Sequence, residues 1–152
     1  MSDTVYPIFL HSLKGVLVVV VGGGKVGERK VQGLLAVEAA VRLISPQATP
    51  RLQELAGQGQ NRNYQSSDLN DATLAFAATD QRAVNQQVLA DAKSQRILCN
   101  VADCAEEGDF HLPAVHREGD LTIAVGSRGR DIHAAKRMRD RIAKVVQAER
   151  NQ

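Results

Sequence analysis

The sequence predicts an α/β fold: a parallel sheet with helices on both faces, followed by a short hairpin and a C-terminal helix. The first observation is a run of six apolar, mostly β-branched residues at 16–21, bounded by turn residues. Strands that read as continuous apolar runs are buried on both faces, as in a parallel sheet covered by helices. The second observation is that apolar runs alternate with amphipathic stretches as far as Asp103, which is typical of βαβ units.

The turn after the first strand holds the most informative motif. Gly22, Gly24 and Gly27 fit G-x-G-x-x-G, directly after a buried strand and before an amphipathic stretch. The first glycine of this motif permits a tight turn, the second lets backbone approach a pyrophosphate, and the third lets helix and strand pack closely. The N–H groups and the positive end of the helix would face the phosphates. The motif therefore predicts a Rossmann-type dinucleotide site.

The segments on either side of this turn fit the same plan. The helix that begins there has one apolar face, because Gly27, Val31 and Leu34 recur at helical spacing. A short apolar segment at 6–10 precedes the first strand, and we expect it to cover one end of the sheet.

The second strand is expected at 41–44 and ends at Ser45 and Pro46. In many NAD-binding folds an acidic residue at this end holds the ribose hydroxyls. Because Ser45 stands there instead, a hydroxyl or a backbone group must hold the ribose. A helix at 47–56 and a weak edge strand near 64–66 are predicted to follow.

The third strand is expected at 74–78, followed by Thr79. Ligands of open parallel sheets bind beyond the carboxyl ends of the strands, so Ala78 and Thr79 are predicted to line the nicotinamide site. A helix at 82–92 and a fourth strand at 97–99 come next.

The pattern changes after Asp103. Apolar runs at 112–115 and 121–125 indicate a hairpin at the edge of the sheet. Residues 131–149 read as one helix with Asp131 as its N-cap. Its apolar stripe needs a partner surface, either on the domain or on a second copy of the chain. The stripe consists of Ile132, Ala135, Met138, Ile142 and Val145.

Length and composition narrow the class of protein. At 152 residues the chain suits one principal domain, with a mainly aliphatic core because only 3% of its residues are aromatic. No apolar run approaches the roughly 20 residues that span a bilayer, and residues 1–14 lack the pattern of a signal peptide. We therefore expect a cytoplasmic protein without a membrane partner. Cys99 and Cys104 lack the spacing of a zinc site, so we predict reduced thiols, with a redox or metal role as the alternative.

The net charge of +2 conceals a basic C-terminal stretch. Its seven basic residues are Arg128, Arg130, Lys136, Arg137, Arg139, Arg141 and Lys144. The stretch is either a solvated helix face or the site of an anionic partner, a polycarboxylate or a nucleic acid. Because no helix-turn-helix, aromatic RNA platform or zinc finger accompanies the charge, we predict no nucleic-acid partner.

With these motifs in place, the chain resembles the precorrin-2 dehydrogenase family, the N-terminal dehydrogenase and ferrochelatase portion of siroheme synthases. The resemblance rests on several separate motifs in one order. These are Tyr6–Leu10, Val20–Lys30, Ser45-Pro46, Ala77–Asp80, Val84-Asn85, Asn100–Asp103, Asp109-Phe110 and Pro113. It implies oxidation of precorrin-2 to sirohydrochlorin with NAD⁺ in siroheme biosynthesis, sometimes with Fe²⁺ insertion as a second activity.

The resemblance also assigns roles to residues. It implies that NAD is bound by Gly22, Gly23, Gly24, Lys25, Val26, Ser45, Pro46, Ala78 and Thr79. It implies a functional carboxylate at Asp103. Separately from the resemblance, we expect substrate contacts at Asn100, Ser127, Arg128 and Arg130. The Asp103 carboxylate follows the end of a strand near the expected nicotinamide, where it would act as a general base or orient the substrate. The alternative is a loop aspartate that caps a turn. His111, His116 and His133 are weaker candidates for proton carriers, and no resident metal is predicted.

The chain departs from the family pattern in three places. Glu38 stands where the family usually has a glycine, so the cap of the first helix must be built differently. The turn at 126–132 has added arginines and lacks the family's proline, which alters the expected substrate contacts. The family commonly continues into a longer helical region, whereas this chain ends at Gln152.

The main hypothesis is an NAD-dependent dehydrogenase that acts as a homodimer on a tetrapyrrole. We expect an NAD-binding domain at 1–112 and a dimerisation and substrate segment at 113–152. Arg128 and Arg130 would hold the substrate carboxylates through paired hydrogen bonds. The alternatives are a non-catalytic NAD-binding or tetrapyrrole-handling module, and a chelatase without dehydrogenase activity, which the glycine turn disfavours.

Overall fold

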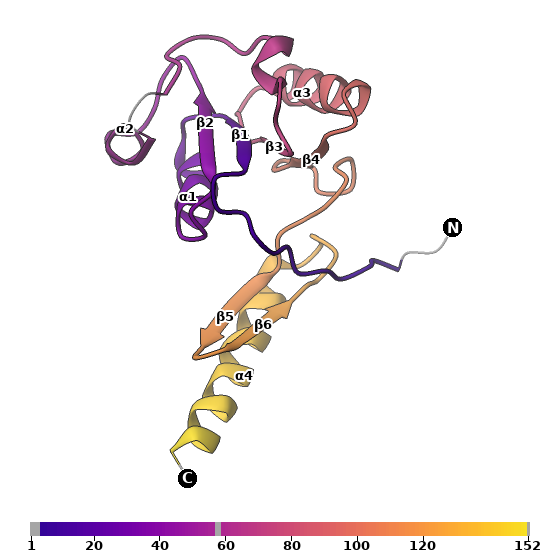
Figure 1. Ribbon diagram of the computed structural model, residues 1–152. Coiled ribbons are helices and arrows are strands. Elements are labelled where there is room, and N and C mark those ends of the chain that lie inside the picture. The colour runs from indigo at the N-terminus through magenta and orange to yellow at the C-terminus, as the bar shows by residue number, and fades with distance from the viewer. Residues whose placement is uncertain (1–3, 57–58, 152) are drawn as a thin grey trace. The chain divides into compact units, whose positions relative to one another are not determined.

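The computed structural model describes residues 4–56 and 59–151, and it divides into two units, Met1–Phe110 and His111–Gln152 (Figure 1). The first unit holds a four-stranded parallel sheet with the strand order β2-β1-β3-β4. Its strands are β1 Leu17–Val21, β2 Ala40–Ile44, β3 Leu74–Ala77 and β4 Leu98–Val101. Its helices are α1 Lys25–Leu35, α2 Pro50–Ala56, the 3-10 helix η1 Ser66–Leu69, and α3 Arg82–Ser94. The predicted fold class is confirmed.

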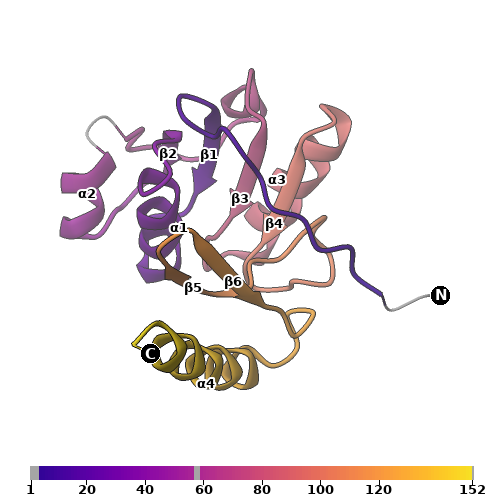
Figure 2. The same ribbon diagram turned by 60° about the horizontal axis from the view of Figure 1, so that its bottom comes forward.

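Strand β1 is buried on both faces, as its apolar run predicts. Val18 and Val20 pack into one core with residues of α1 and α2, and Val19 and Val21 pack into a second core with residues of η1 and α3. Each of these four side chains is at most 2% exposed. Figure 2 shows the helices α1 and α2 on one side of the sheet and α3 on the other. The sheet therefore lies between two helical layers.

Helix α2 begins at Pro50, three residues later than predicted. Proline fixes its own backbone in a conformation suited to a first helical turn and disfavours helical backbone in the residue before it. Thr49 takes the N-cap position, and its hydroxyl accepts the N–H of Leu52 at 3.2 Å. The hydroxyl of Ser45 donates to the carbonyl of Gln47 at 2.5 Å, so the preceding residues form a turn.

The edge strand predicted at 64–66 is wrong. The helix η1 forms instead, because the Asp68 carboxylate accepts the backbone N–H of Gln65 at 2.8 Å and pairs with the Arg62 guanidinium at 2.5 Å. These short-range polar bonds favour a tight turn over extended backbone. The outer edge of β2 is met instead by Gln60, through a single parallel bridge.

The outer edge of β4 is covered by the chain that follows it. The Asp109 N–H donates to the Cys99 carbonyl at 2.8 Å, and the Asp109 carboxylate accepts the Cys99 N–H at 2.9 Å. Gly108 runs so close that a Cβ on it would lie 2.9 Å from the Cys99 carbonyl oxygen. The hairpin was predicted at this edge, and that prediction is wrong because the edge is occupied.

The hairpin forms a separate two-stranded antiparallel sheet in the second unit. Its strands are β5 Ala114–Glu118 and β6 Leu121–Val125, and both contact the helix α4, Ile132–Arg150. The Asp131 carboxylate accepts the N–H of Ala134 at 2.7 Å, which confirms the predicted N-cap. Ala135 of the apolar stripe is buried, whereas Met138 and Val145 are 47% and 59% exposed. No helix in the described ranges is long and apolar enough to cross a membrane.

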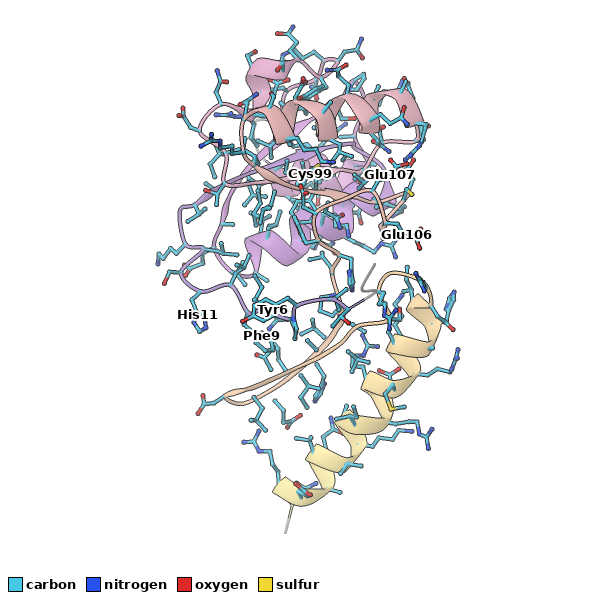
Figure 3. All side chains as sticks on the ribbon, turned by 90° about the vertical axis from the view of Figure 1, so that its right-hand side faces the viewer. Tyr6, Phe9, His11, Cys99, Glu106 and Glu107 are labelled. Atoms are coloured by element: carbon cyan, nitrogen blue, oxygen red, sulfur yellow. The ribbon has the colours of Figure 1, made fainter. Side chains whose placement is uncertain are left out.

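The apolar segment before β1 does not cover the sheet. Tyr6 and Phe9, labelled in Figure 3, are 89% and 60% exposed. Contact with the core begins only at Leu13, whose carbonyl accepts the N–H of Val16 in the turn before β1. Residues 4–12 are all exposed, so they add no buried apolar surface to the sheet.

Glu38 shows how the end of α1 is built without the family's glycine. Its backbone is left-handed, with φ at 58°, a conformation that glycine adopts most easily. The N–H of Ala39 donates to the Leu34 carbonyl at 3.1 Å, so the helix ends through the usual backbone bond. The side chain of Glu38 lies 3.1 Å from Lys14 Nζ, an exposed pair that contributes little. Glu38 therefore adopts the left-handed conformation although it is not a glycine.

Replacement by alanine should have opposite effects on stability at the two glycines within α1, Gly27 and Gly33. A Cβ on Gly27 would overlap the Gly22 carbonyl oxygen, so Gly27→Ala should lower the free energy of unfolding by roughly 1–3 kcal/mol or more. A Cβ on Gly33 would meet nothing within 4 Å, so Gly33→Ala should raise it by about 0.5–1 kcal/mol, because alanine loses less backbone entropy in a helix. Urea unfolding followed by circular dichroism measures both. Equal effects would contradict the steric account.

Candidate functional site

Two glycines of the G-x-G-x-x-G motif are steric requirements. Gly22 has φ at 127°, and a Cβ there would overlap the carbonyl oxygen of Ala78 at the end of β3. A Cβ on Gly27 would overlap the carbonyl oxygen of Gly22. The β1 turn is therefore pressed against both the first turn of α1 and the carboxyl end of β3. Only residues without a side chain permit this approach.

The middle of the turn is open. A Cβ on Gly24 would meet nothing within 4 Å, and Gly24 is the N-cap of α1 with no side-chain capping bond. Lys25 and Val26 follow on the exposed side of the first helical turn. The start of a helix carries N–H groups without helical partners and the positive end of the helix dipole. Backbone at this place has the chemistry to bind a phosphate group.

Gly23 has a role that no position of the motif predicts. A Cβ there would overlap the Gln47 carbonyl oxygen and lie 2.7 Å from the Ser45 hydroxyl. The N–H of Thr49 also donates to the Gly23 carbonyl at 2.9 Å. The loop after β2 thus lies directly against the glycine turn. Ser45 is 8% exposed with its hydroxyl hydrogen engaged in the loop, whereas Pro46 is exposed.

A buried carboxylate joins the glycine turn to that loop. Glu28, in the first turn of α1, is 8% exposed and accepts the Thr49 hydroxyl at 2.6 Å, and it lies 3.6 Å from Lys25 Nζ. The hydrogen bond from Thr49 is the main cause that lowers the pKa of Glu28. Glu28 was not predicted as a site residue. Its place in the first turn of a helix was the available signal, since acidic residues are favoured there.

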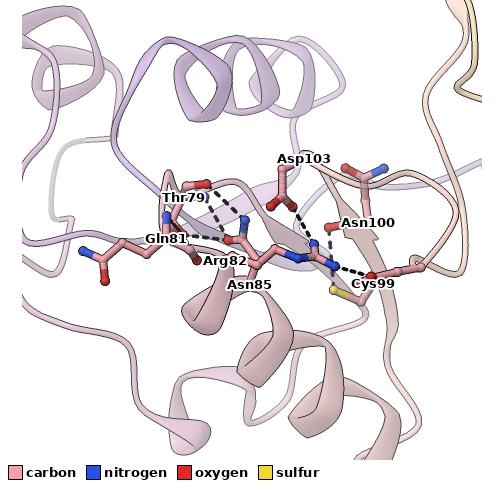
Figure 4. A network of polar contacts seen from close by, with 8 residues as sticks. Thr79, Gln81, Arg82, Asn85, Cys99, Asn100 and Asp103 are labelled. Carbon is pink, nitrogen blue, oxygen red and sulfur yellow. Dashed lines mark hydrogen bonds and ion pairs between the residues drawn. The ribbon is translucent and has the colours of Figure 1, made fainter.

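The turn after β3 is clamped by a buried amide (Figure 4). Asn85 is fully buried, and its Oδ1 accepts the Thr79 N–H at 3.1 Å and lies 2.7 Å from the Thr79 hydroxyl. Its Nδ2 donates to the Thr79 carbonyl at 3.0 Å. The predicted nicotinamide residues Ala78 and Thr79 are thereby held in one backbone conformation. Ala78 is 7% exposed, directly beyond the end of β3.

Asp103 lies in the turn after β4 and is paired with an arginine that sequence reasoning missed (Figure 4). Arg82 Nη1 is 3.3 Å from Asp103 Oδ1, and Arg82 Nη2 pairs with Glu107, which is labelled in Figure 3. The bond to Glu107 is the main cause that raises the pKa of Arg82. Arg82 and Asp103 are 21 residues apart, so no local spacing indicates the pair.

Asn100 sits on β4 and is 3% exposed. Its Nδ2 donates to the Phe110 carbonyl at 2.9 Å, while its Oδ1 has no hydrogen-bond partner in the part of the chain that the structure describes. A buried acceptor without a partner is costly and marks a place where a ligand donor would be favourable. Asn100 was predicted as a substrate contact, and that role stays a prediction.

The other predicted substrate residues belong to the second unit. Ser127, Arg128 and Arg130 form the turn before α4, where the Arg130 N–H donates to the Ser127 carbonyl at 3.0 Å. The Ser127 hydroxyl accepts the N–H of Asp131 at 3.1 Å. Arg128 has a left-handed backbone, with φ at 56°. These three residues therefore lie in one turn.

His116, a weaker candidate for a proton carrier, lies 3.1 Å from the Glu118 carboxylate within the hairpin.

The described residues contain no group of three or more His, Cys, Asp or Glu side chains placed to hold a metal ion. Both cysteines are free. Burial raises the pKa of the Cys99 thiol to about 11, with the Asp109 charge as a further cause. A thiol with that pKa is protonated at neutral pH and is a poor nucleophile or metal ligand.

Comparisons with known proteins identify the family of this chain. A family model described as "Putative NAD(P)-binding" matches residues 9–114. The "Probable multifunctional siroheme biosynthesis protein HemA" of Ruminiclostridium josui is 35% identical over 97% of this chain and 30% of that protein. A "Siroheme synthase" of Nitrosococcus oceani is 36% identical over 92% of this chain and 31% of that protein. The chain therefore spans about three tenths of the length of these relatives.

A solved structure is similar over most of its length. It is titled "SirC, precorrin-2 dehydrogenase" and superposes with a TM-score of 0.77, at 28% identity, over 92% of this chain and 70% of that chain. The likeness extends beyond the residues that the family model matches, so it includes part of the second unit.

Proposed function

The chain belongs to the family described as "Putative NAD(P)-binding", and from this premise we propose that it is an NAD-dependent dehydrogenase that oxidises precorrin-2 to sirohydrochlorin in siroheme biosynthesis. The observation that carries the proposal is the meeting of three features at one edge of the sheet. These are the open glycine turn, the clamped turn after β3, and a carboxylate in the turn after β4. The likeness to a precorrin-2 dehydrogenase structure supports the choice of substrate.

The residues at the first turn fit a dinucleotide. The backbone of Gly24 is open where a phosphate would approach, and the first N–H groups of α1 at Lys25 and Val26 would bind it. Gly22 and Gly23 keep the neighbouring loops close. Ser45 and Pro46 would border the ribose, and Ala78 and Thr79 the nicotinamide. NAD⁺, when bound, supplies the acceptor for a hydride from the substrate.

Asp103 is the proposed general base. Dehydrogenation removes a hydride and a proton from the macrocycle, and the hydride carries both electrons of the broken C–H bond. The proton would pass to the Asp103 carboxylate, which Arg82 contacts at Oδ1. A carboxylate at the carboxyl end of a strand is at the edge where parallel sheets bind their ligands.

The second unit is proposed to bind substrate carboxylates and to form a homodimer. Arg128 and Arg130 precede α4 in one turn, and guanidinium groups bind carboxylates through paired hydrogen bonds. Because exposed ion pairs are screened by salt, the KM for precorrin-2 should rise with ionic strength, and a KM independent of salt would contradict this contact.

The exposed apolar stripe on α4 supports a homodimer, in which a second copy of the chain would cover it.

The first prediction concerns the cofactor. Gly24→Val places a branched side chain where the pyrophosphate should meet backbone, so NAD⁺ affinity should fall by more than about tenfold while the fold persists. Gly33→Val is the matched control, because a Cβ there is equally unobstructed but lies at the other end of α1. Calorimetric titration measures both. Unchanged affinity in a folded Gly24→Val variant would remove the proposed binding mode, and tighter binding of NADP⁺ would reverse the choice of cofactor.

The second prediction concerns catalysis. Asp103→Ala should slow NADH formation from precorrin-2 and NAD⁺ by roughly 10²–10⁴-fold with NAD⁺ affinity unchanged, as expected for a positioned base. Asp120→Ala, which removes an exposed carboxylate from the hairpin turn, should have no effect. Wild-type turnover in Asp103→Ala would assign Asp103 to structure. NAD⁺ binding without any turnover of the wild-type chain would favour a non-catalytic NAD-binding module.

The third prediction concerns assembly. Replacing the exposed stripe residues together, as Met138→Glu with Val145→Glu, should convert a dimer to a monomer, because two charges cannot be buried in an apolar contact. Gln147→Glu adds charge to another side of the same helix and should leave the dimer intact. Light scattering after size-exclusion chromatography measures the mass. A wild-type chain that is monomeric at micromolar concentration would refute the homodimer.

A further inference from the structure

We propose that Arg82 is a positioning residue for the Asp103 carboxylate, an inference that rests on the proposed dehydrogenase function. Arg82 is the first residue of α3, and its Nη1 lies 3.3 Å from Asp103 Oδ1 in the turn after β4. The contact is both a hydrogen bond and an ion pair. The guanidinium of Arg82 therefore constrains the orientation of this carboxylate.

The backbone of Arg82 is itself fixed by the nicotinamide turn. Asn85, one helical turn further along α3, holds the N–H and the carbonyl of Thr79. The start of α3 thus makes two connections at the same edge of the sheet (Figure 4). One reaches back to the turn after β3, and the other reaches across to the turn after β4. Arg82 links the place where hydride would be accepted to the place where the proton would be accepted.

The loop that carries Asp103 is anchored at its two ends. The N–H of Ala102 donates to the Ala77 carbonyl at 2.9 Å, and Asp109 is bonded to Cys99 through both its backbone and its side chain. Between these anchors, Arg82 also pairs with Glu107, so one guanidinium joins two carboxylates of the same loop. The forked geometry of arginine suits this double contact, whereas the single ammonium group of lysine does not.

The exposure of the pair indicates that its main effect is not on stability. The side chains of Arg82 and Asp103 are 41% and 37% exposed, and ion pairs so accessible to water add little to folding. Positioning, in contrast, requires only that the carboxylate keep one direction. A catalytic group displaced by about 1 Å can lose on the order of 10²-fold in rate. Arg82 contacts Oδ1, and the proposed proton acceptor is the other oxygen, Oδ2.

The test is a double-mutant cycle on the full chain, with NADH formation from precorrin-2 and NAD⁺ as the readout. Arg82→Gln should lower kcat by roughly 10–100-fold, while KM and NAD⁺ affinity stay within about twofold. Arg82→Lys should restore part of the loss. In an Asp103→Ala background, Arg82→Gln should cause no further loss, because the group that it positions is gone. Lys93→Gln, at the exposed far end of α3, is the control and should match the wild type.

Several results would overturn the inference. The same fold-loss from Arg82→Gln with and without Asp103 would show that Arg82 acts independently. A rise in KM at constant kcat would make Arg82 a substrate contact. A loss of activity that matches a lowered unfolding midpoint would make it structural. If Asp103→Ala is slow but Arg82→Gln is not, only this inference fails; if Asp103→Ala turns over normally, the proposed base fails with it.

Discussion

The close approach of backbone to backbone at the first glycine turn is the constraint on which the rest of the structure depends. Gly22 brings the end of β1 against the end of β3, Gly27 brings α1 against the same turn, and Gly23 admits the loop after β2. Three segments that are distant in the sequence thereby meet around a point without side chains. A dinucleotide requires such a surface, because its phosphates are bound by backbone N–H groups.

Bringing loops together leaves polar groups that must find partners, and residues of neighbouring elements supply them. Asn85 holds both backbone groups of Thr79, Asp109 holds both of Cys99, and Glu28 accepts the hydroxyl of Thr49, the residue that caps α2. Each of these side chains comes from a different element than the group that it binds. The geometry of the site is thus set by non-local hydrogen bonds on a rigid sheet, which is how a fold can hold reacting groups without strain in the strands.

The fold class could be predicted from sequence because its signals are local: the apolar run of β1, the glycine spacing and the amphipathic face of α1 are each contained within a few turns of chain. The predicted limits of individual elements were wrong where local chemistry overrode the apolar pattern. Asp68 stabilises a turn in place of the predicted edge strand, and proline delays the start of α2 to Pro50. The prediction that the hairpin lies at the edge of the sheet was wrong because Asp109 occupies the outer edge of β4. Among site features, the pairing of Arg82 with Asp103 and the packing against Gly23 join distant residues, so no spacing could reveal them.

The covered edge of β4 has a consequence for the behaviour of the protein at high concentration. An exposed strand edge offers free N–H and carbonyl groups to a strand of another molecule and so invites polymerisation. Here Asp109 consumes the outward N–H and carbonyl of Cys99, and Gly108 lies too close for another chain to enter. The Asp109 carboxylate adds a charge at this edge, which disfavours pairing with another sheet. The loop at 102–109, which carries the proposed base, therefore also disfavours aggregation through β4.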